Sequence, residues 1–480
     1  MERRTKILAT IGPASDSPEV IRGMIRAGMD AVRLNLSHGT VEAAIEVHRR
    51  IRKVADDEGR EIGTLIDLPG PKVRAASFGT EGVDWRAGDV IRIETGFDAS
   101  TKDLVQVATE GVVEGIEAGD RVSFGDGGIV ADVVSTSEAG AVCHVANGGH
   151  LSGSPGVHVP AERLRITSPT EEDLRILDAF VKEGADMVAV SFVRSAHDLR
   201  LLGTEPHPRG PLVVAKIETR AAVENLTGIL DVAGAVMVAR GDLGIEYPLE
   251  EVPHLQKKIV RACIARGRPA ITATQMLESM VHAPTPTRAE ATDVANAVFD
   301  GSSVVMLSGE TAVGDDPVNV IATMERLCRR ADENFDTKAW RHLVAPLRTV
   351  PKAPSKVEDY MVTDTMTAAA AQIADNLGAE AILCITRSGR TVRAMARFRP
   401  RQPILGFSSD PRVLRQLSMS WGSEPLPISS NAFENDTMVT EAVETACKAR
   451  HLRSGDTVVV LAGVQSTSRA TDVLRVVRVP

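Results

Sequence analysis

Short apolar runs alternate with longer amphipathic stretches through the first two thirds of the chain. Eight of these runs are almost continuously apolar, which is typical of parallel strands buried on both faces. They are Lys6–Pro13, Ala31–Ser37, Gly63–Pro69, Met187–Val193, Leu212–Glu218, Val236–Asp242, Ala270–Thr274 and Val304–Gly309. Helical stretches such as Val41–Glu58 and Pro317–Asn334 separate them. Eight strand–helix units predict an α/β fold, a TIM (β/α)8 barrel, with a doubly wound open sheet as the alternative.

The alternation is interrupted between residues 71 and 160, where short strand-like segments are separated by glycine-rich turns. This pattern is typical of a small all-β domain inserted into a barrel loop, and such a domain can act as a lid. A proline-bearing stretch later precedes a separate α/β pattern. We therefore expect a discontinuous catalytic barrel of residues 1–70 and 161–335, an inserted β-barrel lid of 71–160, a linker of 336–354 and a C-terminal α/β regulatory domain of 355–480.

Composition and charge narrow the functional classes. The 480 residues carry a formal net charge of −9 and no dense lysine–arginine run, which argues against a nucleic-acid or membrane partner. The aromatic content of 3% is too low for a base-stacking surface. Because no apolar stretch could cross a bilayer and no signal segment is present, we expect a cytoplasmic protein. The five scattered cysteines form no CxxC pair, which favours free thiols over zinc ligands.

Charged and hydroxylated residues gather where the predicted barrel strands end, and TIM-barrel active sites lie at that end. In the second strand Arg33, Asn35 and Ser37 alternate and therefore share one face. A solvated strand end is the plainer explanation, but polar groups among apolar neighbours need shared partners. Asp67 closes the third strand, and Arg74 follows it.

The ends of the fifth and sixth strands predict a metal site. Lys216 and Glu218 share a face, which alone indicates only a structural ion pair. Asp242 adds a second carboxylate on the neighbouring strand, and two carboxylates with few other ligands suit Mg²⁺. Backbone N–H groups beside Gly241 suit a carboxylate, and Thr274 brings a hydroxyl. A site with cations, a divalent metal and hydroxyls suits phosphoryl transfer.

At these residues the chain resembles pyruvate kinase, and the resemblance runs from end to end. The motifs that carry it are TIGP at Thr10–Pro13, RLNLSHG at Arg33–Gly39, KIE at Lys216–Glu218, MVARGDLG at Met237–Gly244, ATQMLESM at Ala273–Met280, PTRAE at Pro286–Glu290, DVANAVFDG at Asp293–Gly301 and VMLSGET at Val305–Thr311. The family's barrel, lid and C-terminal domains match the predicted organisation. The resemblance implies a glycolytic kinase that moves a phosphoryl group from phosphoenolpyruvate to ADP, giving pyruvate and ATP.

The resemblance also implies a role for each site residue. The implied contacts are Glu218 and Asp242 for Mg²⁺ or Mn²⁺, Arg33 and Lys216 for the transferred phosphoryl group, Gly241, Asp242 and Thr274 for the substrate carboxylate, and Asn35, His38 and Arg74 for the nucleotide phosphates. The implied catalytic residues are Lys216, Arg33, Thr274 and Arg74. Either Thr274 or a water chain through Ser308 protonates the enolate.

The end of the third strand departs from the family pattern. Members that bind K⁺ use an Asn, a Ser, an Asp and the next carbonyl, which correspond here to Asn35, Ser37, Asp67 and Leu68. Where many members have D-T-K-G-P-E, this chain has D-L-P-G-P-K, so Lys72 replaces an acidic residue. A tethered ammonium supplies the charge of a bound cation, and we therefore expect independence from K⁺. A solvated lid residue is the alternative role for Lys72.

Two lysines that face the nucleotide in the family are absent. Pro155 replaces one in the lid, and Val313 replaces the other after the eighth strand. Each lost charge-assisted contact costs about 1.5–3 kcal/mol, which leaves nucleotide affinity and choice open. Arg165 or His158 could compensate.

A loop in the C-terminal segment has the composition of a phosphate site. Thr386-Arg387-Ser388-Gly389-Arg390-Thr391 lies between a predicted strand and a predicted helix. Hydroxyls and glycine at a helix N-terminus suit a phosphate, although an ordinary turn has the same composition. The matching loop in the family holds a phosphate of an activator, so the resemblance implies a phosphorylated allosteric effector. It also implies a homotetramer.

Two other functions remain open from the sequence. A metal-dependent lyase or aldolase acting on a pyruvate enolate explains Arg33 and Thr274, but not Lys216 or the inserted lid. A catalytically inactive relative that senses a metabolite explains the missing lysines, but not the retained Lys216, Glu218 and Asp242. Turnover of a nucleotide by the protein would exclude the lyase or aldolase. Any catalytic turnover would exclude the inactive sensor.

Overall fold

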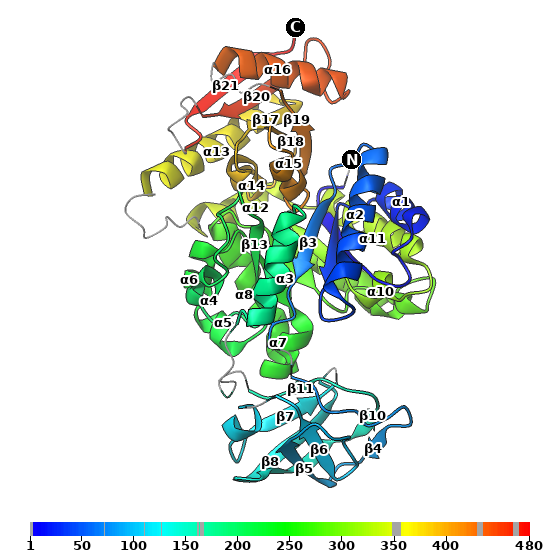
Figure 1. Ribbon diagram of the computed structural model, residues 1–480. Helices are drawn as coiled ribbons and strands as arrows, with labels where there is room; N and C mark the ends of the chain where they lie inside the picture. The colour runs from blue at the N-terminus through cyan, green and yellow to red at the C-terminus, as the bar shows by residue number, and fades with distance from the viewer. Residues whose placement is uncertain are drawn as a thin grey trace.

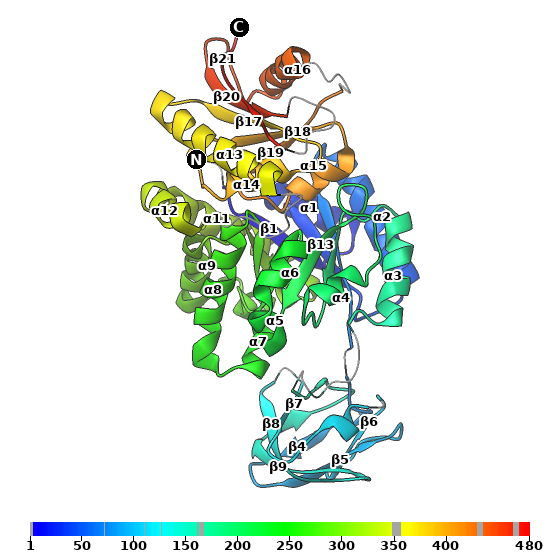
Figure 2. The same ribbon diagram turned by 90° about the vertical axis from the view of Figure 1, so that its left-hand side faces the viewer.

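Three bodies follow one another along the long axis of the molecule. The computed structural model describes residues 3–71, 73–109, 111–125, 127–160, 163, 168–347, 357–429, 435–463 and 470–480. A barrel surrounded by helices lies in the middle, a small all-β body lies at one end, and an α/β body lies at the other (Figures 1 and 2). The three bodies fall within the three predicted domains, whose boundaries remain a prediction.

The central body is a closed barrel of parallel strands, so the TIM-barrel prediction is confirmed and the open sheet is wrong. The strand order is β1-β16-β15-β14-β13-β12-β3-β2. The bounds are β1 Lys6–Ile11, β2 Ala31–Asn35, β3 Gly63–Asp67, β12 Met187–Val190, β13 Leu212–Ile217, β14 Ala235–Ala239, β15 Ala270–Ala273 and β16 Val304–Leu307. Successive side chains point to opposite faces, so Leu8 fills the barrel interior while Ile7 and Ala9 pack outward against helices.

Helices cover the outer face of the barrel. The main ones are α1 Pro18–Ala27, α2 Val41–Asp57, α3 Glu171–Lys182, α4 Ala196–Arg200, α8 Val252–Ala265, α9 Arg288–Asp300 and α11 Pro317–Glu333. Thr170 and Thr287 fix the starts of α3 and α9 through reciprocal capping boxes. Between β13 and β14 the chain forms two short helices, α5 Arg220–Glu224 and α6 Leu226–Val232. Within the described residues, no helix is long and apolar enough to span a membrane.

The strands end earlier at the rim than the apolar pattern predicts. β14 stops at Ala239, and Arg240–Glu246 forms helix α7. Asp242 therefore lies in a first helical turn, and its expected place on the sixth strand is wrong. β16 likewise stops at Leu307, and Gly309–Ala312 forms α10. Beyond the rim a residue has no neighbouring strand to satisfy its backbone groups, so the chain turns.

The inserted body follows the C-terminal end of β3 and lies beyond the end of the barrel where the strands finish (Figure 1). Its strands are β4 Val83–Trp85, β5 Val90–Thr95, β6 Leu104–Val107, β7 Arg121–Phe124, β8 Ile129–Ser137, β9 Gly140–Asn147, β10 Gly149–Leu151 and β11 Val157–His158. Six of them form a sheet in the order β11-β7-β8-β9-β5-β6. Trp85 packs edge-on against Phe78 and Phe124 in its core.

The C-terminal body is a five-stranded sheet with helices on it. Its order is β19-β18-β17-β20-β21, with β21 antiparallel to β20. The bounds are β17 Ala381–Ile385, β18 Ile404–Ser408, β19 Ser423–Pro427, β20 Thr457–Ala462, β21 Val473–Arg478, α13 Val357–Leu377, α14 Arg390–Ala396, α15 Pro411–Leu417 and α16 Asn435–Lys448. The sequence pattern missed β19 and β21. Within the predicted linker, Thr337–Val344 forms helix α12, while residues 348–356 lie outside the described residues.

The C-terminal body closes the bottom of the barrel, at the end opposite the inserted body. Met419 belongs to the same buried cluster as the inward side chains of the barrel strands. The buried carboxylate of Asp186, which precedes β12, accepts hydrogen bonds from Arg415 Nε at 2.8 Å and from the Thr64 N–H at 2.9 Å. At Gly63 a Cβ would come within 2.4 Å of Ser418 Oγ, so this close approach requires glycine. The barrel mouth therefore stays available on the other side.

Candidate functional site

An ion-pair network joins three strands at the barrel mouth. The Asp67 carboxylate at the end of β3 accepts from Arg33 Nε on β2 at 2.6 Å, and Lys216 Nζ on β13 lies 3.5 Å from its other oxygen. Burial disfavours the ionised form of Asp67, but Lys216 and Arg33 outweigh it and hold the pKa of Asp67 below its usual value. Arg33 also donates to Thr10 Oγ1 at 3.2 Å. Both cations are thus fixed in the positions that the sequence pattern predicts.

Lys216 is held from two further sides. Its Nζ donates to Ser191 Oγ at 2.6 Å and lies 3.3 Å from Glu218 Oε2. Burial disfavours its charge, but Asp67, Glu218 and Asp242 more than offset burial and raise the pKa of Lys216. The ammonium is therefore charged at neutral pH and has one fixed orientation.

Glu218 is a buried carboxyl with an unused acceptor. Its Oε1 accepts from the Phe192 N–H at 2.5 Å, whereas Oε2 has no hydrogen-bond partner among the described residues. Burial raises its pKa to about 7, because the attraction of Lys216 does not fully compensate and Asp242 adds negative charge. An unsatisfied buried carboxylate oxygen is costly, so this side chain is suited to a cation that the protein alone does not supply.

The residues around Glu218 fit a divalent cation with few protein ligands. Glu218 and Asp242 line one cleft together with residues of the inserted body, including Val157 and His158. No three His, Cys, Asp or Glu side chains converge on a common point within the part of the chain that is described. Two carboxylates that leave positions for water and substrate oxygens are typical of Mg²⁺, whereas a full cage is typical of Ca²⁺.

Thr274 and Gly241 meet across the rim from neighbouring strands. The Gly241 N–H donates to Thr274 Oγ1 at 2.9 Å, and this hydroxyl donates to the Ala273 carbonyl at 2.6 Å. Thr274 has a backbone φ of 66°, and Gln275 has one of 52°. Two consecutive left-handed residues other than glycine are strained, and such strain persists only where the surroundings impose it.

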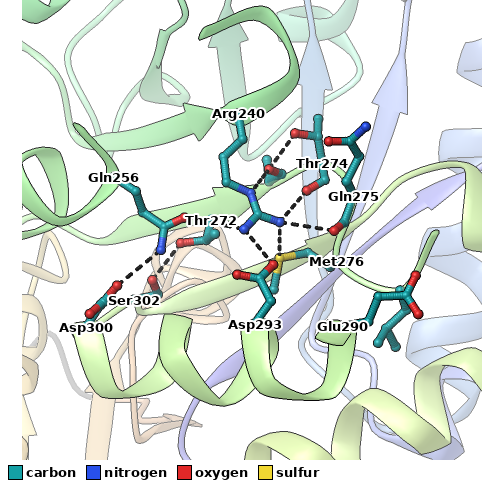
Figure 3. A network of polar contacts seen from close by, with 12 residues as sticks. Arg240, Gln256, Thr272, Thr274, Gln275, Met276, Glu290, Asp293, Asp300 and Ser302 are labelled. Carbon is teal, nitrogen blue, oxygen red and sulfur yellow. Dashed lines mark hydrogen bonds and ion pairs between the residues drawn. The ribbon is translucent and has the colours of Figure 1, made fainter. Parts of the chain in front are cut away.

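Arg240 holds the turn at Thr274 through hydrogen bonds to its carbonyls. No role for Arg240 was predicted from the sequence. Figure 3 shows its guanidinium among the carbonyls of the Thr274 turn. It donates to Ala273 O at 3.1 Å, Thr274 O at 2.5 Å and Gln275 O at 3.2 Å, while Asp293 of α9 pairs with it at 2.6 Å. The sequence feature that could have indicated this role is the position of Arg240 directly before Gly241 and Asp242. Its fork of donors satisfies the carbonyls that the strained turn leaves unpaired.

Glu310 is a second residue whose role was missed. This fully buried carboxylate accepts from the Leu277 N–H at 3.0 Å and from the Ser308 N–H at 2.6 Å. It therefore ties the turn after Thr274 to the end of β16.

Asn35 and Asp67, which are predicted for a monovalent cation, are paired residues on the adjacent strands β2 and β3. Asn35 Oδ1 accepts from the Ser37 N–H at 3.3 Å, and the Leu68 carbonyl accepts from Ser191 Oγ at 2.7 Å. Arg74 lies in the inserted body, where it donates to the Ser154 carbonyl at 3.0 Å. His38 is exposed just beyond β2. Lys72 and Arg165 lie outside the described residues.

The predicted effector loop is a turn that leads into α14. Gly389 adopts a φ of 73°, Arg390 Nη2 donates to Thr363 Oγ1 at 3.3 Å, and the Thr391 and Thr471 hydroxyls lie 2.7 Å apart. Helix α14 belongs to the C-terminal body, and the barrel lies between this body and the inserted body (Figure 1).

Comparisons with known proteins point to one family. The barrel domain of pyruvate kinase matches residues 2–321, and its alpha/beta domain matches residues 364–477. A pyruvate kinase of Mycobacterium tuberculosis is 38% identical over 100% of this chain and 99% of its own length. A pyruvate kinase of Methylorubrum extorquens is 38% identical over 99% of this chain and 97% of its own length. The crystal structure of a pyruvate kinase from Cryptosporidium parvum has a TM-score of 0.89 and 30% identity, covering 100% of this chain and 96% of that one.

Replacing Arg240 by lysine tests its positioning role. Lysine keeps the charge but lacks the planar fork of five donors that spans these carbonyls, so we expect the turn at Thr274 to shift and pyruvate formation to fall about 100-fold. The control is Arg266→Lys, since Arg266 pairs with Asp231 at 3.0 Å at the opposite end of the barrel. Circular dichroism confirms that both variants fold. Unchanged turnover in Arg240→Lys contradicts the role.

Proposed function

The chain belongs to the pyruvate kinase family, and from that premise we propose that the network around Lys216 transfers the phosphoryl group of phosphoenolpyruvate to ADP. The observation that carries the proposal is the fixed pair of cations, Arg33 and Lys216, beside a buried carboxylate with an unused oxygen. Phosphoryl transfer depends mainly on positioning and on neutralising negative charge, which these groups provide.

Each residue of the site has one task in this reaction. Lys216 and Arg33 contact the phosphoryl oxygens, while Asp67 and Ser191 hold Lys216 in place. The phosphorus–oxygen bond to the enol breaks, a bond to a terminal oxygen of ADP forms, and the resulting enolate takes a proton to become pyruvate. Thr274, or a water held near Ser308, delivers that proton.

The substrate carboxylate is assigned to the backbone N–H groups of Gly241 and Asp242 and to Thr274. The Gly241 N–H is bonded to Thr274 Oγ1, so the carboxylate would share or replace that bond. The family requires a divalent metal in general, and we propose Mg²⁺, with Mn²⁺ as a substitute, held by Glu218 and Asp242. When bound, such a cation neutralises and orients phosphoryl oxygens.

Nucleotide binding is proposed to differ from the family pattern. Val313 is exposed where a lysine is common, and Pro155 lies beside Ser154, the acceptor of Arg74. Asn35 and His38 complete the proposed nucleotide side of the site. The ring of His158 is engaged with the Gly125 carbonyl at 3.0 Å, which makes it a weak substitute for a missing lysine.

Regulation and assembly are proposed from the family resemblance. We assign a phosphorylated effector to the turn of residues 386–391, where Thr386 and Thr391 bring hydroxyls and Arg387 and Arg390 bring charge. A homotetramer and a cytoplasmic location belong to the same proposal.

The direct test is pyruvate formation from phosphoenolpyruvate, ADP and Mg²⁺. We expect turnover in the wild type and a loss of about 1,000-fold or more in Lys216→Met, because a cation facing the transferred charge is removed. Lys257→Met is the control, since Lys257 pairs with Asp300 on the outside of the barrel. Wild-type protein without turnover, repeated with other nucleoside diphosphates and phosphorylated activators, would refute the proposed function and favour a sensor.

A separate test addresses the monovalent cation. We propose that Lys72 supplies the charge for which relatives use K⁺, so replacing K⁺ by an inert cation should leave wild-type turnover unchanged. Lys72→Glu should lose about 10- to 100-fold of its turnover without K⁺ and recover when K⁺ is added, which corresponds to a charge-assisted contact of about 1.5–3 kcal/mol. The control is Lys102→Glu, another lysine of the inserted body. A wild type that needs K⁺ contradicts the assignment.

A further inference from the structure

A small cavity lies between the bottom of the barrel and the C-terminal body, far from the Lys216 network. Four arginines line it: Arg268, which precedes β15, and Arg393, Arg397 and Arg399 of the C-terminal body. The remaining wall includes Trp421 and residues at the starts of β15 and β16. Four arginine residues around one cavity bring positive charge that the proposed reaction does not use.

Arg399 is the most deeply buried of the four. It is only 2% exposed, and its guanidinium lies over the ring of Trp421 at 4.4 Å. Its Nη2 donates to the Gly301 carbonyl and, at 3.0 Å, to the Ser302 carbonyl, which lie at the end of α9. Nε and Nη1 have no hydrogen-bond partner among the described residues. Half of this buried cation is therefore unsatisfied.

The charges around the cavity do not balance. Arg397 pairs with Asp364, but no described carboxylate forms an ion pair with Arg268, Arg393 or Arg399. Arg268 Nε is buried without a hydrogen-bond partner, and Arg393, 3% exposed, also has one unpaired buried nitrogen.

The groups that do contact these arginines are neutral. Arg393 Nη2 donates to the Ser388 carbonyl at 2.7 Å and to His207 Nε2 at 3.1 Å. Burial and the nearby cations Arg393 and Arg268 lower the pKa of His207 to about 3, so this ring is neutral and supplies no further positive charge. Guanidinium groups keep their charge in proteins, so the four arginines outnumber the carboxylates that act on them in the described structure, which are Asp364 beside Arg397 and Asp332 near Arg399.

We propose that the cavity lined by Arg268 and Arg399 binds a small inorganic anion that joins the C-terminal body to the barrel. An anion accepts hydrogen bonds from the unpaired nitrogens and also supplies negative charge. A water molecule accepts hydrogen bonds but supplies no charge. The cavity has space for about one water-sized group, which excludes a sugar phosphate or a nucleotide and favours a monatomic anion such as chloride over a phosphate-like group. This site is independent of the proposed catalytic function, and Arg393 connects it to the turn proposed for the effector through the Ser388 carbonyl.

The test measures the thermal midpoint of the full chain at constant ionic strength. Sodium chloride replaces sodium gluconate in one series, and sodium phosphate replaces it in another, so that the two anions are distinguished. We expect a saturable rise of the midpoint with one or both anions, because a ligand that binds only the folded state stabilises it. In Arg399→Met this rise should disappear, and Arg268→Gln provides a second variant if the first fails to fold.

The matched control is Arg175→Met, since Arg175 is an exposed arginine on α3 that pairs with Glu172 at 3.1 Å. It should keep the full anion dependence. Crystals soaked in bromide should show an anomalous peak beside Arg399. The same anion dependence in Arg399→Met, Arg268→Gln and Arg175→Met would overturn the proposal, as would a cavity that contains only water in crystals grown with chloride or phosphate.

Discussion

The pairing of Asp67 with Arg33 and Lys216 is the interaction on which the chemistry of this barrel depends. Three charged groups from three different strands meet here: the buried Asp67 carboxylate lies between Arg33 and Lys216, whose side chains are largely shielded from solvent, and it would lose compensation if either cation were removed. The pairing fixes two cations where phosphoryl oxygens must be bound, and it orients Lys216 toward Ser191 and Glu218. The arrangement has more acceptor capacity than the protein uses, since Glu218 Oε2 accepts no hydrogen bond among the described residues and has the Lys216 ammonium 3.3 Å away. A divalent cation would bind to this unused oxygen of Glu218.

The mouth of the barrel carries the reactive groups, and the bottom of the barrel carries contacts that stabilise the fold. At the mouth, strained residues such as Thr274 are held by the fork of Arg240, and a buried carboxylate is left unsatisfied. At the bottom, Met419 fills the barrel and Arg415 pairs with Asp186, so the C-terminal body is fixed to the scaffold. The arginine-lined cavity lies at this second interface. An anion bound there would change how firmly the C-terminal body is attached to the barrel, without contacting the Lys216 network.

The sequence predicted the barrel well because buried parallel strands are continuously apolar, and this signal is local. It predicted the cations and carboxylates of the mouth because they interrupt those apolar runs. It failed where tertiary contacts decide the backbone: Arg240–Glu246 turns into a helix once β14 has no further neighbour, and the partly exposed edge strand β21 carries no clear apolar run. The role of Arg240 was equally hidden, because its acceptors are backbone carbonyls, which the residue types of a sequence do not reveal.

We propose that Glu218 and Asp242, beside Lys216 and Asp67, hold a divalent cation at the barrel mouth. Electron paramagnetic resonance of Mn²⁺, titrated into the protein with phosphoenolpyruvate present, measures this directly and needs no turnover. We expect one tight Mn²⁺ site per chain. This site should be lost in Glu218→Gln and retained in Glu246→Gln, since Glu246 lines the same cleft. Equal Mn²⁺ binding by the wild type and Glu218→Gln would contradict it.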